Sequence, residues 1–566
     1  MYYIDWIVLF LTLLLIVVYG IYKSRGKKNL DSYLVANREM PWYNVGLSVM
    51  ATQASAITFL SAPGQGFTDG TRFVQFYFGL PLAMLVLCIT FVPIFHRLKV
   101  YTAYEYLEQR FDLKTRSFTA FLFLIQRGVS TGITIYAPSI ILSTLLGMSH
   151  YYTTTIIGVL VILYTVYGGT KAVSHTHFLQ MFIIFTGMFV AGYMIIHLLP
   201  EGFGFSETYH LAGELGKLNT IDTKMDWNNK YNVWSGLLGG FFLALSYFGT
   251  DQSQVARYLA GKSIKESRLG LIMNGIVKIP MQYLILMLGA LLVVFYQFHS
   301  APIYFNQQAV NEIKSTKYAS KFDSLESIAK EIAVVKKQNI EKLSNAYTSN
   351  NSNDANQVIE TLKINEQRYQ EIRKETKSLM DKAKLLNDAD DSNYIFLSFV
   401  MNHLPTGLVG LLIAIIFLAS MGSTAAGLSS LANTTCVDVY RSLINREADD
   451  ETYVKYSRIF TIAWGIFCMI VAYFAGKIGN LIEAVNILGS LFYGTILGIF
   501  IVAFYFKKLG ANATFYAALI AEAIVCVVYY FDLTAFLWLN VIGCLGVVII
   551  AYLITLLANN KVIKQA

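Results

Sequence analysis

Long apolar segments recur along this sequence, and each is close to the length that a helix needs to cross a lipid bilayer. A helix spans the hydrocarbon core with about 20 residues and satisfies its own backbone hydrogen bonds there. We therefore predict an all-α polytopic membrane protein embedded in a bilayer. Thirteen transmembrane spans are expected at roughly 4–22, 43–66, 73–96, 116–145, 151–168, 176–199, 232–259, 268–297, 403–438, 456–475, 481–506, 512–530 and 534–557.

Basic residues gather in alternate loops of this topology. They follow the first, third, seventh, ninth and eleventh spans: Lys23, Arg25, Lys27, Lys28, Arg38, His96, Arg97, Lys99, Arg257, Lys262, Lys265, Arg268, Arg441, Arg446, Lys507 and Lys508. Cytoplasmic loops are enriched in Lys and Arg, so the pattern predicts an N-out/C-in orientation. These loops explain the formal charge of +8, and we expect no nucleic-acid partner.

Residues 51–66 read Ala-Thr-Gln-Ala-Ser-Ala-Ile-Thr-Phe-Leu-Ser-Ala-Pro-Gly-Gln-Gly and lie within the second span. Small residues, hydroxyls and the Pro63-Gly64 pair make a poor continuous lipid-facing helix. Broken helices are tolerated where they line a cavity, and transporters use such breaks to hold an ion and a substrate. The alternative is a small-residue face that packs against another helix.

Residues 300–394 break the apolar pattern, since they are rich in Lys, Glu, Asn and Ser. Apolar residues at helical spacing in 322–347 and 357–386 flank the polar stretch 348–354. We predict an antiparallel helical hairpin on the outer side. Two alternatives stay open: a flexible insertion without a role in transport, and a binding site for an unknown partner.

The sequence contains no pattern typical of catalysis. Its five cysteines lie scattered in apolar segments without metal-ligand spacing. No nucleophile–base pair or phosphate-binding loop is apparent. We predict that the protein is not an enzyme and needs no organic cofactor.

Several unusual short motifs follow one another along the chain. They are the interrupted second span, Gly79-Leu-Pro81, Val92-Pro-Ile-Phe95, Tyr101-Thr-Ala-Tyr-Glu-Tyr-Leu-Glu-Gln-Arg-Phe111, Ile135-Tyr-Ala-Pro138, Tyr167-Gly-Gly169, Gln252 to Arg257-Tyr258, and Asp438-Val-Tyr440. In this order they resemble the sodium/solute symporter family, which includes the sodium/glucose, iodide, monocarboxylate and multivitamin symporters. The resemblance covers about residues 5–300 and 400–510.

The resemblance implies a leucine-transporter-like core of two inverted five-helix repeats. These would be residues 43–199 and 232–506, the second interrupted by the 300–394 insertion. Residues 1–42 would form a first helix and a cytoplasmic loop. Residues 200–231 would form an extracytoplasmic loop, and residues 507–566 two further helices and a cytoplasmic tail.

A sodium site is also implied by the resemblance. Its ligands would be the carbonyls of Ala51, Ala54 and Ala419 and the hydroxyl of Ser423. Such oxygen ligands suit a hard cation. Many members carry two adjacent hydroxyl residues, whereas Gly422 precedes Ser423 here. Ser420, Thr424 or water would then replace the lost ligand, or sodium would bind more weakly; helix packing is the alternative explanation for these small residues.

A second departure from the family pattern concerns His177. After Tyr-Gly-Gly the family usually carries a Trp-Thr-Asp segment, and His177 stands in the place of the Asp. The hydroxyls that some members use for a second sodium fall at Ala425 and Ala426. We therefore predict a single sodium site. A proton role for His177 is an alternative, because imidazole titrates near physiological pH; the other is a purely structural hydrogen bond.

Candidate substrate contacts cluster on the broken second span, on the expected break of the seventh and at the start of the eleventh. They are Gln53, Ser55, Thr58, Asp251, Gln252 and Asn486. Lys278 falls where sugar-transporting relatives carry a substrate-contacting Lys. Ile57 and Thr58 do not reproduce the polar pair of a galactose-type site, which makes a sugar less favoured as the substrate.

Arg127 lies well inside the fourth span, where charged residues usually face the bundle interior. Its guanidinium suits bidentate binding of a carboxylate. It would bind an anionic substrate, pair with an internal acid such as Asp251, or serve helix packing.

The resemblance implies a multi-pass protein of the cell (cytoplasmic) membrane that imports a small organic solute, a carboxylate or a sugar, with sodium as coupling ion. Transport would proceed by alternating access between the two sides of the membrane. The alternatives are a symporter-like sensor and an ion-leak protein without net solute transport.

Overall fold

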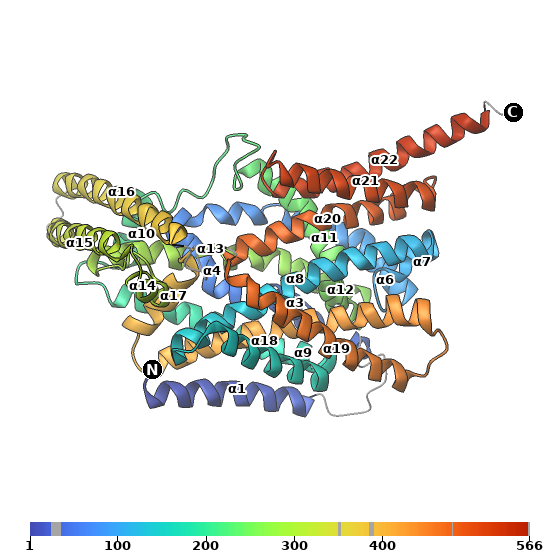
Figure 1. The fold of residues 1–566 in the computed structure, drawn as a ribbon, viewed down its shortest axis with the longest axis horizontal. Coiled ribbons are helices and arrows are strands. Elements are labelled where there is room, and N and C mark those ends of the chain that lie inside the picture. The colour runs from blue at the N-terminus through green and yellow to red at the C-terminus, as the bar shows by residue number, and fades with distance from the viewer. Residues whose placement is uncertain (24–34, 349–351, 384–389, 478, 564–566) are drawn as a thin grey trace.

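The computed structural model describes residues 1–23, 35–348, 352–383, 390–477 and 479–563. Across these ranges the regular structure is helical, with one isolated bridge between Met40 and Gly261 and no strand. The prediction of an all-α protein is therefore confirmed. Figure 1 shows the helices as a bundle whose long axes run broadly in one direction.

The α-helices are α1 (Tyr3–Lys23), α3 (Trp42–Gln53), α4 (Ala56–Asp69), α5 (Leu80–Val86), α6 (Val92–Leu98), α7 (Glu105–Arg110), α8 (Leu113–Leu146), α9 (His150–His197), α10 (Phe205–Glu214), α11 (Gly240–Thr250), α12 (Gln252–Leu259), α13 (Ile264–Phe298), α14 (Gln307–Ile313), α15 (Ala319–Thr348), α16 (Ser352–Lys382), α17 (Ser392–His403), α18 (Leu408–Thr434), α19 (Asp450–Phe474), α20 (Leu481–Tyr505), α21 (Ala511–Tyr530) and α22 (Leu537–Ile563). Short 3-10 or π-helical segments are η1 (Ala36–Arg38), η2 (Gly70–Tyr77), η3 (Leu87–Phe91), η4 (Ser235–Gly239), η5 (Thr435–Ile444) and η6 (Ala475–Lys477).

Nine helical stretches in the described part of the chain are long and apolar enough to cross a membrane: Ala56–Leu98, Leu113–Leu146, Thr176–His197, Ile264–Phe298, Leu408–Ile444, Asp450–Phe474, Leu481–Tyr505, Ala511–Tyr530 and Leu537–Ala558. Three shorter apolar helices accompany them at Tyr3–Ile16, His150–Val166 and Ser235–Thr250. The chain is a multi-pass membrane protein, whereas thirteen spans and the N-out/C-in orientation stay predictions. Of the basic loop residues, Arg25, Lys27 and Lys28 lie outside the described residues, and Arg257 is buried within α12 rather than exposed in a loop.

Two apolar helices are interrupted by extended backbone. Ala54 and Ser55 separate α3 from α4, and Asp251 (φ −73°, ψ 116°) separates α11 from α12. The Ser55 amide donates to the Gln53 carbonyl and the Thr58 amide to the Ser55 carbonyl. The carbonyls of Ala51 and Ala54 therefore lose the amides that a continuous helix would offer them.

The expected break at Pro63-Gly64 is wrong, because both residues lie inside the continuous helix α4. Gly64 has a packing role instead. A β-carbon at this position would lie 1.9 Å from the carbonyl oxygen of Ser392, so only glycine allows α17 to approach α4 so closely.

Helix α9 doubles back between its two apolar arms. The hydroxyls of Tyr164 and Thr176 lie 2.9 Å apart. A straight helix would separate these residues by about 18 Å along its axis, which is beyond the reach of the two side chains. The chain therefore turns between them. The side chains of 167–175, which include the Tyr-Gly-Gly motif, lie outside the described part.

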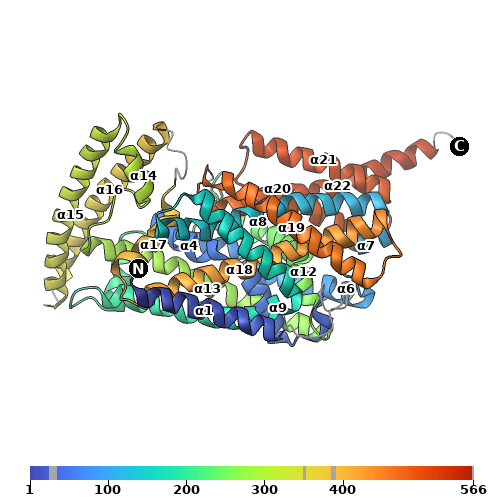
Figure 2. The ribbon, with the colours of Figure 1, turned by 60° about the horizontal axis from the view of Figure 1, so that its bottom comes forward.

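Helices α15 and α16 form an antiparallel hairpin at one end of the molecule (Figures 1 and 2). The hairpin has its own apolar core, which includes Leu325, Ile332 and Tyr369. Buried Lys336 and Glu366 form an ion pair between the two helices, and Glu366 also accepts a 2.9 Å hydrogen bond from Gln297 of α13. The hairpin is thereby attached to the bundle. Residues 349–351 of its polar tip lie outside the described residues.

The chain ends lie at opposite ends of the bundle. The amino end of α1 lies near the hairpin, and the carboxyl end of α22 lies at the end that carries α7 (Figure 1). Asp5 is buried and accepts hydrogen bonds from the amides of Gly407 (2.6 Å) and Gly410 (3.3 Å), which holds α1 against the start of α18.

Candidate functional site

A polar cavity of about 100 Å³ lies beside the break between α3 and α4. Seven elements contribute its walls: α3, α4, η2, α8, α11, α18 and α20. The lining residues are Thr52, Gln53, Ser55, Ile57, Thr58, Phe76, Tyr77, Gln126, Arg127, Ser130, Thr134, Leu243, Tyr247, Ser423, Ile482, Val485, Asn486, Gly489 and Tyr493. Both halves of the chain therefore meet at one internal site.

Five of the predicted substrate contacts line this cavity: Gln53, Ser55, Thr58, Arg127 and Asn486. Among the described residues, Oε1 of Gln53, Oε1 of Gln126 and Nε of Arg127 are buried without a hydrogen-bond partner. Buried polar atoms are nearly always paired, so these three are free to contact a ligand.

Arg127 lies close to Asp251, as one of the sequence alternatives requires. The Arg127 Nη1 atom is 3.7 Å from Asp251 Oδ2, and both side chains are buried. Asp251 also accepts hydrogen bonds from the Tyr493 hydroxyl (2.7 Å), the Ser253 amide (2.8 Å) and the Ser253 hydroxyl (2.6 Å). The carboxylate is therefore well paired without the arginine, whereas the arginine lines the cavity.

Asp251, Gln252 and Lys278 do not line the cavity. Asp251 lies behind Arg127 and Tyr493. Gln252 faces another way: its Oε1 accepts from the Ala103 amide (3.1 Å) and its Nε2 donates to the Tyr101 carbonyl (2.7 Å). Lys278 is fully buried on α13, with Nζ 5.4 Å from the ring centroid of Tyr77.

The four predicted sodium ligands are buried at the first break and on α18. The Ser423 hydroxyl donates to the Ala419 carbonyl (2.9 Å) and also lines the cavity. The freed carbonyls of Ala51 and Ala54 lie on α3 and just beyond its end. The ligand set and the cavity thus share α3 and Ser423.

Two alternative hydroxyls were expected to replace the ligand missing at Gly422. The Ser420 hydroxyl donates to the Thr134 carbonyl of α8 (3.4 Å), whereas the Thr424 hydroxyl is buried without a partner among the described residues. Of the two, Thr424 retains a free oxygen.

Gly422 and His177, the two departures from the family pattern, are neighbours. A β-carbon at residue 422 would lie 2.6 Å from Gln180 Oε1 and 3.0 Å from His177 Nε2. His177 is fully buried, and its Nδ1 lies 3.0 Å from the Ser48 hydroxyl of α3. The imidazole therefore connects α3, α9 and α18 in the space that a larger residue 422 would occupy.

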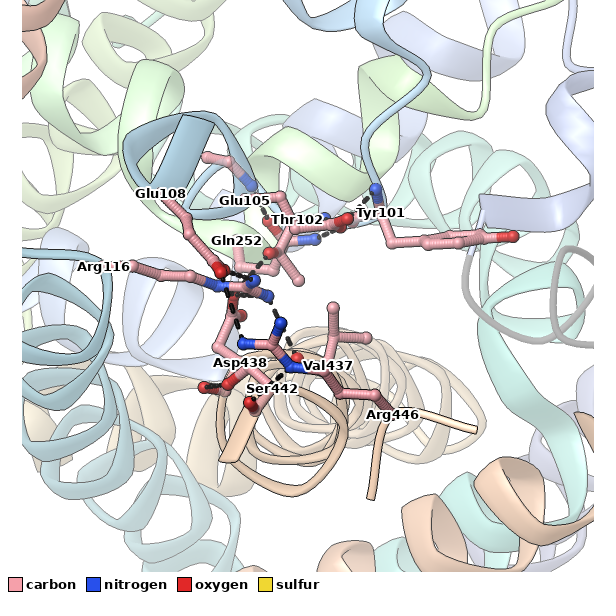
Figure 3. Close-up of polar contacts among 11 residues, drawn as sticks. Tyr101, Thr102, Glu105, Glu108, Arg116, Gln252, Val437, Asp438, Ser442 and Arg446 are labelled. Carbon is pink, nitrogen blue, oxygen red and sulfur yellow. Dashed lines mark hydrogen bonds and ion pairs between the residues drawn. The ribbon is translucent and has the colours of Figure 1, made fainter. Parts of the chain in front are cut away.

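A polar network at the end opposite the hairpin was not assigned a role from the sequence (Figure 3). Arg116 of α8 donates to Asp438 Oδ1 (2.8 Å) and the Val437 carbonyl (3.0 Å), and it pairs with Glu108. Thr102 also donates to Asp438 Oδ1 (2.8 Å). Charged residues at the ends of apolar spans were the available signal, but their pairing depends on the fold.

The network joins the segment of residues 101–110, which includes α7, to η5 after α18, and Gln252 adds the start of α12. Glu105 Oε1 orders the same segment by accepting from the amides of Tyr101 (2.8 Å) and Thr102 (2.9 Å). Segments from both halves of the chain are thus fastened together at this end of the bundle.

Comparisons with known proteins agree with this architecture. A solved structure of a sodium-coupled sialic acid symporter, in a substrate-bound outward-open state, has the same fold: the TM-score is 0.75, with 22% identity over 98% of both chains. A sodium/sialic acid symporter of Proteus mirabilis is 24% identical over 97% of this chain and 94% of its own length. The sodium-coupled monocarboxylate transporter 1 of Xenopus laevis is 32% identical over 48% of this chain and 43% of its own length.

A family model described as the sodium:solute symporter family matches residues 33–320 and 380–521, most of the chain. The resemblance read from the short motifs is thus confirmed. Sodium is the coupling ion of these relatives, their substrates are small molecules, and none of them is an enzyme. This chain belongs to the sodium:solute symporter family.

Proposed function

We propose that the protein imports a small organic carboxylate across the cell membrane with sodium as the coupling ion. The observation that carries this proposal is the position of Arg127. Its guanidinium is one wall of the cavity between the two broken helices, and its Nε has no hydrogen-bond partner among the described residues. A guanidinium in this position suits bidentate binding of a carboxylate.

The start of α4 provides the second half of the anion site. Ser55 is extended, its side chain does not cap the helix, and α4 begins at Ala56. The first amides of a helix lack intrahelical partners and favour negative charge. Ser55 and Thr58 add hydroxyls on the same wall of the cavity. A carboxylate between Arg127 and this helix end would therefore receive hydrogen bonds from the protein on both sides.

Asp251 makes the arginine available to the solute. Because three donors from Ser253 and Tyr493 already satisfy its carboxylate, Asp251 remains stable when Arg127 turns towards a second carboxylate. The remaining polar walls, Gln53, Gln126 and Asn486, would bind the rest of the solute. The sialic acid and monocarboxylate relatives are named for carboxylate solutes, which supports this solute class.

Sodium at Ala51, Ala54, Ala419 and Ser423 would couple to the solute through shared structure. Ser423 belongs both to this ligand set and to the cavity wall, and the two carbonyls flank the break that positions Ser55. Sodium would fix the break in the form that binds the carboxylate. One sodium and one monocarboxylate together carry no net charge, so the sodium concentration gradient rather than the membrane potential would drive this uptake.

The test is sodium-driven uptake into proteoliposomes of a labelled small-carboxylate panel and of matched neutral sugars. We expect sodium-dependent carboxylate uptake that falls at least tenfold in Arg127→Gln and in Ser423→Ala. Arg127→Lys, which keeps the charge but not the forked geometry, should recover only part of it. Arg97→Gln, an exposed arginine, is the matched control and should transport normally.

Other outcomes separate the alternatives. Sugar uptake that ignores Arg127→Gln would refute the carboxylate proposal and return the arginine to a structural role. Sodium current without any solute uptake would favour an ion-leak protein. Sodium binding without current or uptake would favour a sensor.

A further inference from the structure

Helix α13 carries three polar residues on one face, away from the residues that line the cavity. Asn274, Lys278 and Gln282 follow at intervals of four residues, and each is 0% exposed. Residues at this spacing lie above one another on the same side of a helix. The interior of the bundle therefore contains a polar stripe that the transport site described above does not use.

The polar atoms of this stripe lack protein partners. Among the described residues, Nζ of Lys278 and both amide atoms of Asn274 and of Gln282 have no hydrogen-bond partner. The described contact of the ammonium group is the ring of Tyr77, at 5.4 Å. A cation–π contact contributes about 2 kcal/mol at most when desolvated, far less than the cost of burying a lone ammonium.

The stripe faces the broken helix and η2. Neighbouring glycines of α13 lie against their backbones: Gly270 against Gly46 of α3, and Gly289 against Pro63 and Phe67 of α4. Tyr77, which lies over Lys278, belongs to η2 and also lines the cavity. The unpaired cation is thus enclosed between α13, the broken helix and η2.

Lys278 differs in this respect from Arg127, whose charge has Asp251 nearby. An ionised group held deep in a bundle requires a counter-charge or strong hydrogen bonds. The ammonium has three donors, and each neighbouring amide offers two more. A site built from N–H donors around one positive charge selects a small anion.

We propose that Lys278, Asn274 and Gln282 form a binding site for a small inorganic anion, with chloride as the probe, separate from the solute cavity. The anion neutralises Lys278, while the two amides donate to it or to its hydration water. Because Tyr77 lies between Lys278 and the cavity, the bound anion also sets the position of one cavity wall. This site does not depend on which solute the protein transports.

The direct test is equilibrium binding of radiolabelled chloride to purified full-length protein in sodium methanesulfonate, without solute. We expect saturable binding to the wild type and at least a tenfold loss of affinity in Lys278→Met. Asn274→Ala and Gln282→Leu should each weaken binding several-fold. Lys321→Met, an exposed lysine of the hairpin, should bind as the wild type does.

Further arms identify the cation responsible. Arg127→Gln should retain chloride binding; loss there with retention in Lys278→Met would place the anion in the cavity and overturn the proposal. Chloride binding that acetate displaces equally well in wild type and Arg127→Gln would make Lys278 a carboxylate contact instead. The absence of saturable chloride binding to the wild type would also refute the site, whatever the folding of the variants.

Discussion

Residue 422 shows how one missing side chain shapes its surroundings. Gly422 of α18 lies where Gln180 and His177 of α9 approach the helix, and any β-carbon there would meet both. The departure from the paired hydroxyls of the family and the replacement of an acidic residue by His177 therefore belong together.

We expect Gly422→Ser to lower the thermal stability of the protein. The new side chain would collide with Gln180 Oε1, and overpacking of a core typically costs about 1–3 kcal/mol. Adding Gln180→Ala should restore much of the stability. Gly510→Ser is the control, since nothing lies within 4 Å of a β-carbon there. A melting temperature that Gly422→Ser leaves unchanged would contradict this packing.

His177→Asn tests the proton hypothesis. Nδ1 of the ring contacts the Ser48 hydroxyl, and Nε2 has no hydrogen-bond partner among the described residues. No carboxylate among the described residues therefore stabilises a charged imidazole. We therefore expect the pH profile of sodium-driven uptake to stay the same in His177→Asn. A profile that shifts by more than half a pH unit would restore the proton role.

At the scale of single elements, the hairpin depends on a buried ion pair. Burial by itself raises the pKa of Glu366, but the Lys336 ammonium and hydrogen bonds from Gln297 and Gln370 outweigh it and hold that pKa below its usual range. A lowered pKa means that the pair stabilises the folded hairpin above the ordinary glutamate pKa. This stability is lost as the pH falls through the lowered value.

Glu366→Gln should therefore loosen the hairpin at neutral pH. Breaking a buried ion pair leaves the Lys336 charge uncompensated, at a cost of about 3–5 kcal/mol. Hydrogen exchange should show faster amide exchange in α15 and α16, with α18 unaffected. The double variant Lys336→Met/Glu366→Leu should recover protection, because an apolar pair fills the same space. Equal exchange in wild type and Glu366→Gln would refute this role.

Helices were predictable from the sequence because hydropathy and periodicity are local properties. The interruption near Gln53 and the extended Asp251 also followed from small and polar residues within apolar spans. The break predicted at Pro63 was wrong, because α4 accommodates this proline without an interruption. The turn inside α9 was expected, because two apolar runs, His150–Val166 and Thr176–His197, flank it.

Contacts between distant elements were less accessible to sequence reasoning. Helical spacing tells which face a residue occupies, but not which element lies opposite or at what depth. Gln252 therefore looked like a substrate contact, although it binds the backbone of Tyr101 and Ala103. The lining residues Gln126, Ser130 and Thr134 were missed, although their four-residue spacing within an apolar span was a usable signal.

At the scale of the whole molecule, the polar network of Arg116 and Asp438 fastens the end opposite the hairpin. Alternating access requires one end to open while the other is closed. Asp438 is fully buried and receives both Arg116 and Thr102, so its loss would free two elements at once. We expect Asp438→Asn to open this end and reduce concentrative uptake.

The measurement is the reaction of a cysteine at Thr58→Cys with a membrane-impermeant maleimide, applied separately to each side of vesicles. Asp438→Asn should speed the reaction several-fold from the side that carries α7 and not from the hairpin side. Arg446→Gln removes an exposed partner of Glu108, 3.5 Å away, and a 3.1 Å hydrogen bond to the Ser442 carbonyl, and should change little. The parent chain without Thr58→Cys corrects for native cysteines. An unchanged rate would show that the network does not close this end.

Asp251 and Gln252 are consecutive residues whose side chains contact different parts of the molecule. The first belongs with Arg127 and Tyr493 beside the cavity, and the second holds the loop whose Thr102 binds Asp438. The surroundings of the cavity and the polar network of Arg116 and Asp438 are therefore separated by a single peptide unit at this point. When a solute draws Arg127 away, a rotation of the Asp251–Gln252 peptide would directly shift the polar network of Arg116 and Asp438. No long chain of intervening side chains would be needed.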